Sequence, residues 1–399
     1  MPSQSPTPAS RPANTPEANE LLDRARTLLP LVRAHAERNN QQRDVAPEVV
    51  AALKEAGLFK LLQPAAWGGY EASPLTFYGV QNLIAEACAS TAWIYGVLSV
   101  QSFILALMDR QAQTDVWGED SNTLMSSSFQ PVGKVQPVDG GYRISGRWTF
   151  SSGSSHARWV LVGSLVPPAA EGQPPHMRLF LVPRADYEIV DTWHTIGLRG
   201  TGSNDIAIDD VFVPAYRTHQ PSPGIVPTTG AGHLAPLHRL PWLYMFTSTV
   251  SNLGIGMGRA ALNTFIAIER ERVSILTGKA AKEDPAVHSA AARLSAEIAA
   301  MEAMYQRHIG NMMELIERNE AMSMTDGLMQ RTQLTSALRR IAAIVDDMQQ
   351  LLGGRGIRLD SGLVHIWLDL CAARAHPGND PGMIAPAYGK SLLDQPAGN

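Results

Sequence analysis

The chain has 399 residues, more than one compact core usually holds, so two or three packed regions are expected. Hydrophobic residues make up 45% and charged residues 18%, a balance typical of a globular protein with a large buried core. The net charge of -4 and the lack of a basic stripe argue against nucleic acid and anionic membranes as partners. The two cysteines, Cys88 and Cys371, show no metal-ligand spacing, so we expect no metal and a reducing cytoplasm.

Residues 1–18 are rich in Pro, Ser and Ala, and they lack the apolar core of a signal peptide. This composition predicts a disordered tail. No stretch of the chain approaches the roughly 20 apolar residues that span a bilayer. The sequence therefore predicts a soluble, intracellular protein.

Residues 19–121 show helical spacing of apolar residues, with Pro30 placed to kink or split the first helix. Gly57 is a predicted helix stop, Pro74 a predicted helix start, and the apolar run 90–108 a predicted core helix. Residues 122–217 instead alternate and turn, which predicts a β domain with strands at 142–148, 159–163, 177–182, 206–208 and 211–214.

The segment 218–241 is a predicted loop, and a loop of that length is usually functional or mobile. Residues 242–399 return to helical periodicity, in predicted helices at 250–277, 286–318, 326–352 and 362–375. Long amphipathic helices of this kind indicate a bundle. The predicted fold class is therefore α+β, with helices, then strands, then a helix bundle.

Three stretches carry a resemblance to a known family: residues 62–69 (LQPAAWGG), 141–153 (GYRISGRWTFSSG) and 197–204 (GLRGTGSN). With the element order, they resemble the acyl-CoA dehydrogenase superfamily, which has an N-terminal α-helical domain, a central β domain and a C-terminal four-helix bundle. Within it the chain is most similar to the oxygenase components of two-component flavin-dependent monooxygenases, including phenol hydroxylases and indole oxygenases.

The resemblance implies a homotetramer that receives reduced FAD, with FMN possible, by diffusion from a separate NAD(P)H:flavin reductase. It also implies O2 as co-substrate, a C4a-hydroperoxide of the flavin as the oxygenating species, and a small aromatic substrate. The alternatives are an acyl-CoA dehydrogenase, a monooxygenase acting on nitrogen or sulfur, and a flavin-binding protein without activity.

Serine hydroxyls supply the expected contacts to the flavin ring. Ser151 matches the family position that contacts flavin N5, and Ser152 and Gly153 follow it, the glycine allowing close backbone approach. The resemblance places Ser126, Ser127 and Ser128 at the pyrimidine side of the ring. A serine-rich turn and an ordinary strand edge are the alternative interpretations of these two segments.

Charged and glycine-rich segments match the family's contacts to the rest of the cofactor. Arg199 lies in the 197–205 loop, and Arg272 follows a long predicted helix, where relatives place an arginine against flavin phosphates. Gln350, Gly353 and Gly354 resemble the segment that holds the adenosine end of FAD from a neighbouring subunit. Structural ion pairs, a solvated charged helix face and a glycine helix cap are the alternatives.

A proline argues against dehydrogenation. Where the family's dehydrogenases carry the glutamate that removes the substrate proton, this chain has Pro377, which cannot act as a base. The neighbouring His376 matches a histidine near the flavin in the monooxygenases, and histidine handles protons near neutral pH. We therefore expect His376 and Ser151 to be catalytic.

The substrate prediction depends on Gln101. Phenol hydroxylases similar to this chain place a histidine there, and glutamine cannot deprotonate a phenol, so a neutral heteroaromatic such as indole is favoured. His194 is a further candidate substrate residue, with a structural role as its alternative. Aromatic walls are expected from Phe103, Trp193, Trp242, Tyr244 and Phe246, each of which is equally typical of a core.

Overall fold

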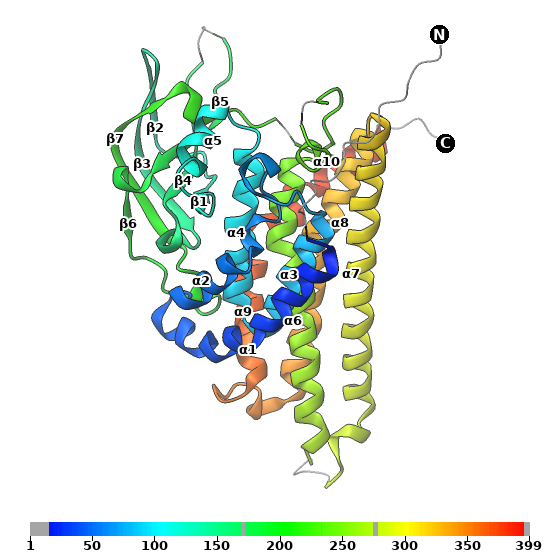
Figure 1. Ribbon diagram of the computed structural model, residues 1–399. Coiled ribbons are helices and arrows are strands. Elements are labelled where there is room, and N and C mark those ends of the chain that lie inside the picture. Colours follow the sequence, from blue (N-terminus) through cyan, green and yellow to red (C-terminus); the bar gives the residue numbers. More distant parts are fainter. Residues whose placement is uncertain (1–15, 169–171, 223, 233, 274–277, 395–399) are drawn as a thin grey trace.

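A computed structural model describes residues 16–168, 172–222, 224–232, 234–273 and 278–394 of the chain. Along the chain, helices precede and follow a region of strands, which lies at the left of Figure 1. The predicted α+β fold class and element order are confirmed. Most of the predicted tail, residues 1–15, lies outside the described residues.

Five helices precede the first strand: α1 (Ala18–Gln42), α2 (Pro47–Glu55), α3 (Pro74–Ala87), α4 (Ala89–Leu105) and α5 (Arg110–Trp117). All 17 residues of α4 are buried, as expected for a helix that is apolar on every side. The prediction that Pro30 splits the first helix is wrong, because α1 runs through it. Pro30 lies on the exposed face, where water can satisfy the carbonyl that the proline leaves unbonded.

The strands form two four-stranded sheets. One sheet has the order β1 (Met125–Ser128), β4 (Trp159–Val166), β5 (His176–Pro183) and β8 (Thr218–His219), and the other β2 (Lys134–Val138), β3 (Gly141–Ser151), β7 (Asn204–Pro214) and β6 (Glu188–Val190). Only the β1–β4 pair is parallel among these pairings. Apolar side chains from both sheets form one shared core, which includes Ile144, Trp148, Val160, Phe180 and Ile206.

Two details of the predicted β region differ from the structure. The two short strands expected at 206–208 and 211–214 are one strand, β7, which continues through Asp210 at a positive φ of 50°. Strands β1, β2, β6 and β8 were not predicted, because their short sequences carry too little alternation to distinguish them from loops. Among them, β1 contains the three serines expected to contact the flavin.

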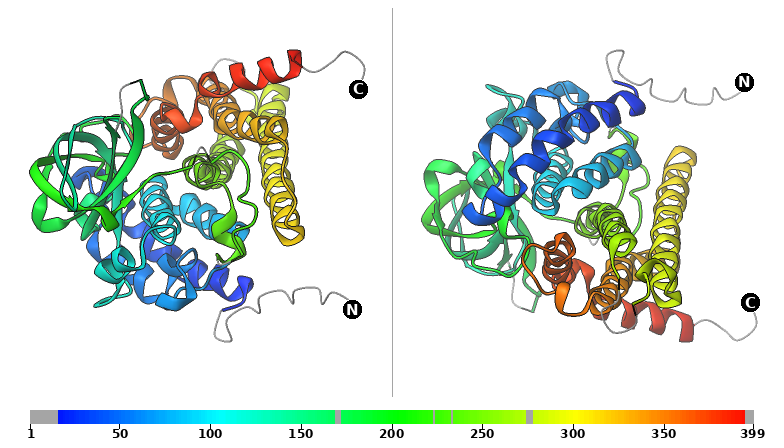
Figure 2. Two further views of the ribbon diagram at one scale, coloured as in Figure 1. Left: turned by 90° about the horizontal axis from the view of Figure 1, so that it is seen from above. Right: turned by 90° about the horizontal axis from the view of Figure 1, so that it is seen from below.

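The chain ends in helices α6 (Trp242–Glu271), α7 (Pro285–Arg318), α8 (Met324–Leu351), α9 (Gly362–Arg374) and α10 (Ala385–Leu393). Helix α6 starts eight residues before the predicted 250, since burial of its first turns outweighs the weak helix propensity of their aromatic and threonine residues. It packs against α3, α4, α7, α8 and α9, and it occupies the centre of the helices in Figure 2. Part of the predicted end of this helix, residues 274–277, lies outside the described residues.

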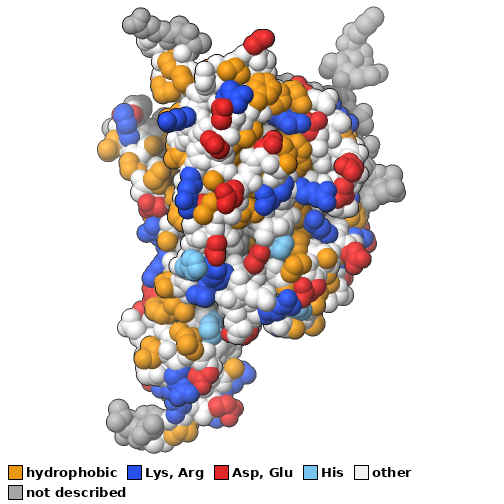
Figure 3. Space-filling model, turned by 90° about the vertical axis from the view of Figure 1, so that its left-hand side faces the viewer, with side chains coloured by type: hydrophobic (Ala, Val, Ile, Leu, Met, Phe, Trp, Pro, Cys, Tyr) orange, Lys and Arg blue, Asp and Glu red, His pale blue; other side chains and the backbone are white. Residues whose placement is uncertain are grey.

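Basic and acidic side chains are interspersed on the face of the molecule drawn in Figure 3. Among the described residues, no helix is both long and apolar enough to cross a membrane. Within the same residues, no group of three or more His, Cys, Asp or Glu side chains is placed to hold a metal ion.

Candidate active site

The first candidate site residues lie on one face of α4. Trp93, Val97 and Gln101 follow at intervals of four residues, so they lie on the same side of the helix. The Gln101 side chain is fully buried, and its Nε2 donates to the Val97 carbonyl (2.8 Å) and to the Ser127 hydroxyl (2.9 Å). Because a carbonyl can only accept, the amide orientation is fixed. Gln101 Oε1 is then left buried and without a hydrogen-bond partner among the described residues.

The hydroxyls of the three serines on strand β1 differ in their hydrogen bonding. Ser127 accepts the bond from Gln101, and Ser128 donates to the Thr149 carbonyl (2.7 Å). The Ser126 hydroxyl is buried and has no partner among the described residues. Of the three, Ser126 therefore keeps its whole hydrogen-bonding capacity for a bound molecule.

The end of β3 is bent by an irregularity in its pairing with β7 between Trp148 and Ser151. Phe150 in this bend has a φ of 64°, which is uncommon for a residue other than glycine, and its side chain is exposed. The Ser151 hydroxyl points inward instead, fully buried and unpartnered among the described residues. Gly153 has a φ of 67°, and a Cβ there would meet the Leu98 side chain at 3.0 Å.

A directed chain of hydrogen bonds runs beside Ser151. The Trp93 indole donates to Ser152 (3.0 Å), Ser152 and Ser203 are 2.6 Å apart, as are Ser203 and Thr201, and Thr201 donates to the Leu198 carbonyl (2.9 Å). An indole N–H only donates and a carbonyl only accepts, so each hydroxyl must donate toward Leu198. The Ser152 hydrogen is therefore already used, whereas the Ser151 hydrogen is free for a ligand.

Aromatic side chains close the site. The His376 ring lies 5.5 Å from the Trp93 ring and 6.3 Å from the Phe246 ring, and Phe246 lies 5.0 Å from Phe129. Phe129 directly follows β1, and Ser127 on that strand is hydrogen-bonded to Gln101. We call this group the contact ring: Trp93, Gln101, Ser127, Phe129, Phe246 and His376, in which Trp93 and Gln101 are joined only along α4 and Ser127 and Phe129 only along the chain at the end of β1.

His376 is neutral in the contact ring. Its Nδ1 accepts from the Gly378 N–H (2.9 Å), so the proton of the neutral imidazole is on Nε2. Burial lowers the pKa of His376 to about 4, because the charged form loses its hydration. The sequence had suggested a group that titrates near neutral pH, whereas the neutral ring in this structure presents an Nε2–H donor.

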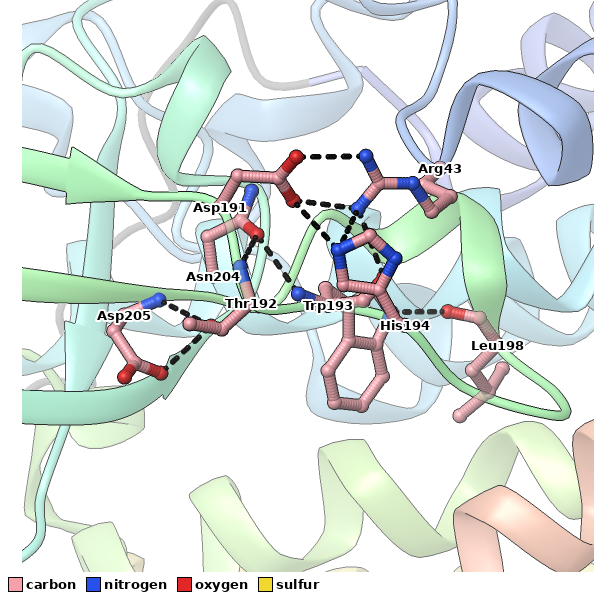
Figure 4. A network of polar contacts seen from close by, with 8 residues as sticks. All are labelled: Arg43, Asp191, Thr192, Trp193, His194, Leu198, Asn204 and Asp205. Carbon is pink, nitrogen blue, oxygen red and sulfur yellow. Dashed lines mark hydrogen bonds and ion pairs between the residues drawn. The ribbon is translucent and has the colours of Figure 1, made fainter.

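Several predicted substrate residues lie outside the contact ring. Phe103 faces the opposite side of α4 and packs against the His238 ring at 5.4 Å. His194 belongs to a network in which Arg43 pairs with both oxygens of Asp191 (Figure 4). About two-thirds of the His194 side chain is exposed.

Trp193 and Trp242, which the sequence analysis assigned to the substrate, also lie outside the contact ring. Trp193, in the network of Figure 4, donates from its indole to the Leu198 carbonyl and packs beside Phe150. Trp242 lies 5.9 Å from Phe129, just outside the contact ring.

The residues predicted to hold the rest of the cofactor are spread more widely. Arg199 donates to the carbonyls of Asn40 and Thr195, and it forms no ion pair with any described residue. Arg272, in contrast, pairs with the buried Glu269 (2.8 Å), which neutralises the charge expected to meet a phosphate. Gln350 is exposed in the last turn of α8, the exposed Gly353 and Gly354 follow the helix, and a Cβ at either glycine would meet nothing within 4 Å.

Sequence reasoning missed Trp93, Thr201 and Ser203. Trp93 was hidden in an apolar helix, although its spacing from Gln101 is a signal that could have identified it. Thr201 and Ser203 belong to the 197–204 motif, but only the three-dimensional structure brings their hydroxyls next to Ser152.

The described residues fit a flavin ring. Its polar edge carries donors and acceptors, and the buried polar atoms without a partner among the described residues include Gln101 Oε1 and the hydroxyls of Ser126 and Ser151. Ser126 and Ser151 are serines that the family resemblance had assigned to this edge, and Gly153, which follows Ser151, has a positive φ. Together with the fold, these features fit a flavoprotein.

Comparisons with known proteins agree. Residues 15–117 match the family model for the N-terminal domain of acyl-CoA dehydrogenases, and residues 248–381 match the model for their C-terminal domain. The oxygenase subunit HsaA of a flavin-dependent monooxygenase from Rhodococcus jostii (strain RHA1) is 35% identical over 94% of this chain and 98% of its own length. The oxygenase component of an FADH2-dependent resorcinol hydroxylase from Rhizobium sp. (strain MTP-10005) is 31% identical over 96% of this chain and 97% of its own length.

The crystal structure of 3-HSA hydroxylase from Rhodococcus sp. RHA1 has a TM-score of 0.85 and 33% identity to this chain, covering 96% of it and 99% of that chain. The chain therefore belongs to the flavin-dependent monooxygenases that share the acyl-CoA dehydrogenase fold.

Proposed function

We propose that this protein is the oxygenase component of a two-component system that uses reduced flavin and O2 to oxygenate a small aromatic molecule bearing a neutral N–H or O–H group. Reduced FAD, with FMN as the alternative, arrives from a separate NAD(P)H-dependent reductase, and no metal takes part. When bound, the reduced flavin supplies the electrons and the activated oxygen. The protein's own residues bind and orient the partners and hold protons.

The observations that support this proposal are the contact ring, with the buried and unpartnered Gln101 Oε1, and the buried, unpartnered hydroxyls of Ser126 and Ser151. Leaving a buried polar atom without a partner costs about 1–3 kcal/mol, so the protein is more stable when a ligand completes the set. Ser151 and Ser126 are the hydroxyls offered to the flavin edge. The aromatic side of the ring, formed by Phe129 and Phe246, excludes water from the place where the substrate meets the cofactor.

Gln101 limits the substrate. Its Nε2 already has two acceptors, so only Oε1 remains, and an amide oxygen requires a hydrogen-bond donor. It cannot remove a proton, which favours an indole-like heteroaromatic over a phenolate. The relative named a resorcinol hydroxylase points to phenols, and a phenol in its neutral form meets the same acceptor.

His376 contributes a proton-holding donor. With Nδ1 bound to the Gly378 N–H, its Nε2–H is the donor available to an oxygen atom inside the contact ring. A neutral imidazole keeps this hydrogen throughout the neutral pH range, because the pKa of His376 is lowered to about 4.

We also propose that the chain assembles as a homotetramer. Exposed apolar side chains gather in the last part of the chain, at Ile357, Leu359, Met383, Leu392 and Leu393. The exposed Gln350, Gly353 and Gly354 lie next to them in sequence and are suited to receive the adenosine end of a cofactor held by another copy. Light scattering of the purified protein tests this assembly.

The test of function mixes the protein with reduced flavin, O2 and a panel of indoles and phenols, followed by mass and regiochemical analysis of products. We expect an oxygen atom from O2 in an aromatic product, with indole-like substrates turned over more efficiently than phenols. An acyl-CoA with an artificial electron acceptor is the control for dehydrogenation, and Pro377 predicts no turnover. Consumption of reduced flavin with hydrogen peroxide as the only product would refute the proposal.

A further inference from the structure

Asp369 on α9 reaches across to the loop that precedes β7. The Leu198 N–H donates to its Oδ1 at 2.6 Å, a short bond of the kind that a charged acceptor makes. The two residues are 171 positions apart in the sequence, so the bond fixes the C-terminal helices against the β region. No substrate or cofactor atom is needed to explain this contact.

The packing around the bond leaves the loop little freedom. A Cβ on Gly197 would lie 2.0 Å from the Leu368 carbonyl oxygen, so only glycine permits this approach of loop and helix. Leu198 itself has a φ of 49°, a conformation that a residue other than glycine keeps only when its surroundings enforce it. The Asp369 bond to the Leu198 N–H is one such constraint.

The Leu198 carbonyl is the end point of the directed chain of hydrogen bonds. It accepts from Thr201, and the chain continues through Ser203 and Ser152 to the Trp93 indole in the contact ring. If Leu198 relaxed to a negative φ, its carbonyl would turn away, and Thr201 would lose the acceptor that sets the direction of the chain. The orientation of the Ser152 hydroxyl beside Ser151 therefore depends on Leu198.

A carboxylate is a costly way to hold this loop. Burial raises the pKa of Asp369 to about 6, against the opposing effects of the Leu198 N–H and of His365. Asp369 lines a cavity of about 350 Å³ between α1, α3, α6 and α9, which is also lined by the charged or titratable residues Arg33, Glu86, Cys88 and His365. An asparagine would accept the same N–H without the cost of burying a charge.

We propose that Asp369 is a positioning residue for the oxygenation reaction. It keeps Leu198 in its left-handed conformation and thereby orients the hydroxyls that lie between the Trp93 indole and the Leu198 carbonyl. This inference rests on the proposed function of the contact ring. Asp369 itself touches neither flavin nor substrate.

Two variants separate positioning from general stability. In Asp369→Ala we expect amide hydrogen exchange to become at least tenfold faster across residues 197–203, and the yield of aromatic product per reduced flavin to fall several-fold with KM changed less than twofold. Asp369→Asn keeps an acceptor for the Leu198 N–H and should restore most of both properties. The matched control is Asp346→Asn, which weakens the bonds from Trp367 and Arg374 on α9 without touching the loop, and should leave the product yield unchanged.

A third variant covers the case in which Asp369→Ala does not fold. Thr201→Val interrupts the hydroxyl chain between Leu198 and Ser203, and should reduce product yield to a similar degree while leaving KM unchanged. Wild-type exchange rates in Asp369→Ala, or full product yield in Thr201→Val, would overturn the inference. If the wild-type protein forms no aromatic product at all, the proposed function fails, while the exchange rates still decide whether Asp369 holds the loop.

Discussion

The side chains of Gln101 and Ser127 are joined by a hydrogen bond of 2.9 Å, although one lies in the middle of α4 and the other on strand β1. Since this bond and the Val97 carbonyl use both hydrogens of the amide, Gln101 presents only an oxygen to the contact ring. Under the proposed function, we expect the specificity of the site to follow from that one free acceptor.

Gln101→Leu removes the acceptor while keeping a side chain of similar size. A lost hydrogen bond to a buried group costs about 1–3 kcal/mol, so we expect kcat/KM for indole to fall about tenfold or more. N-methylindole has no N–H, and its kcat/KM should be low in the wild type and unchanged or higher in the variant. Steady-state kinetics with the two substrates checks this, and an equal loss for both would contradict the acceptor role.

Ser151→Ala deletes a hydroxyl that has no partner among the described residues. We expect little change in folding stability, but a rise in the fraction of reduced flavin whose oxygen is released as hydrogen peroxide instead of reaching the substrate. The control is Ser128→Ala on the neighbouring sheet, whose hydroxyl donates to the Thr149 carbonyl. It should lose about 1 kcal/mol of unfolding free energy with normal peroxide release. Quantifying peroxide and product together distinguishes the two.

His376 makes the protein sensitive to acid. Its pKa is about 4 in the folded state against an ordinary value of 6.5, so between these values the unfolded state binds more protons. Stability from this group is complete above pH 6.5 and is lost as the pH falls toward 4, by on the order of 3 kcal/mol.

His376→Gln should flatten this dependence and also lower product yield, as urea unfolding at pH 7.5 and pH 5 and product assays would show. His308→Gln is the control: burial also lowers the pKa of His308 to about 4, but its ring bonds with Tyr244 and Gln333 in the helix bundle. His308→Gln should flatten the pH dependence of the unfolding free energy and leave the product yield unchanged. A wild-type product yield for His376→Gln would leave His376 without a catalytic role.

Arg331→Met should stabilise the protein. The Arg331 guanidinium is 7% exposed, its Nε and Nη1 have no partner among the described residues, and it forms no ion pair with them. Burial lowers its pKa to about 10, so it is still charged at neutral pH. Replacing an uncompensated buried charge by an apolar side chain is expected to raise the unfolding free energy by about 1–3 kcal/mol.

The matched control is Arg239→Met. Arg239 is equally buried but donates to the Thr228 carbonyl and to Asn319 Oδ1, so its loss should destabilise the fold. Chemical unfolding of both variants measures the contrast. Destabilisation of similar size in both would show that Arg331 has a partner in solution.

The order of elements and the motifs at residues 141–153 and 197–204 were sufficient to predict the fold class, because long periodic helices and a family's signature turns are local properties of the chain. Ser151, Gln101 and His376 could be selected for the same reason. The short strands and the start of α6 could not be predicted, since their stability comes from burial against distant segments.

By itself the sequence determined which groups are present: an amide at position 101, hydroxyls at 151 and 152, and an imidazole at 376 beside a proline that cannot act as a base. Only the tertiary structure decided the state of those groups. It used the hydrogen of Ser152 and left that of Ser151 free, it fixed the proton of His376 on Nε2, and it left His194 at the surface. Hydrogen bonding and hydration depend on which distant segments pack together, and that packing is a property of the folded chain as a whole.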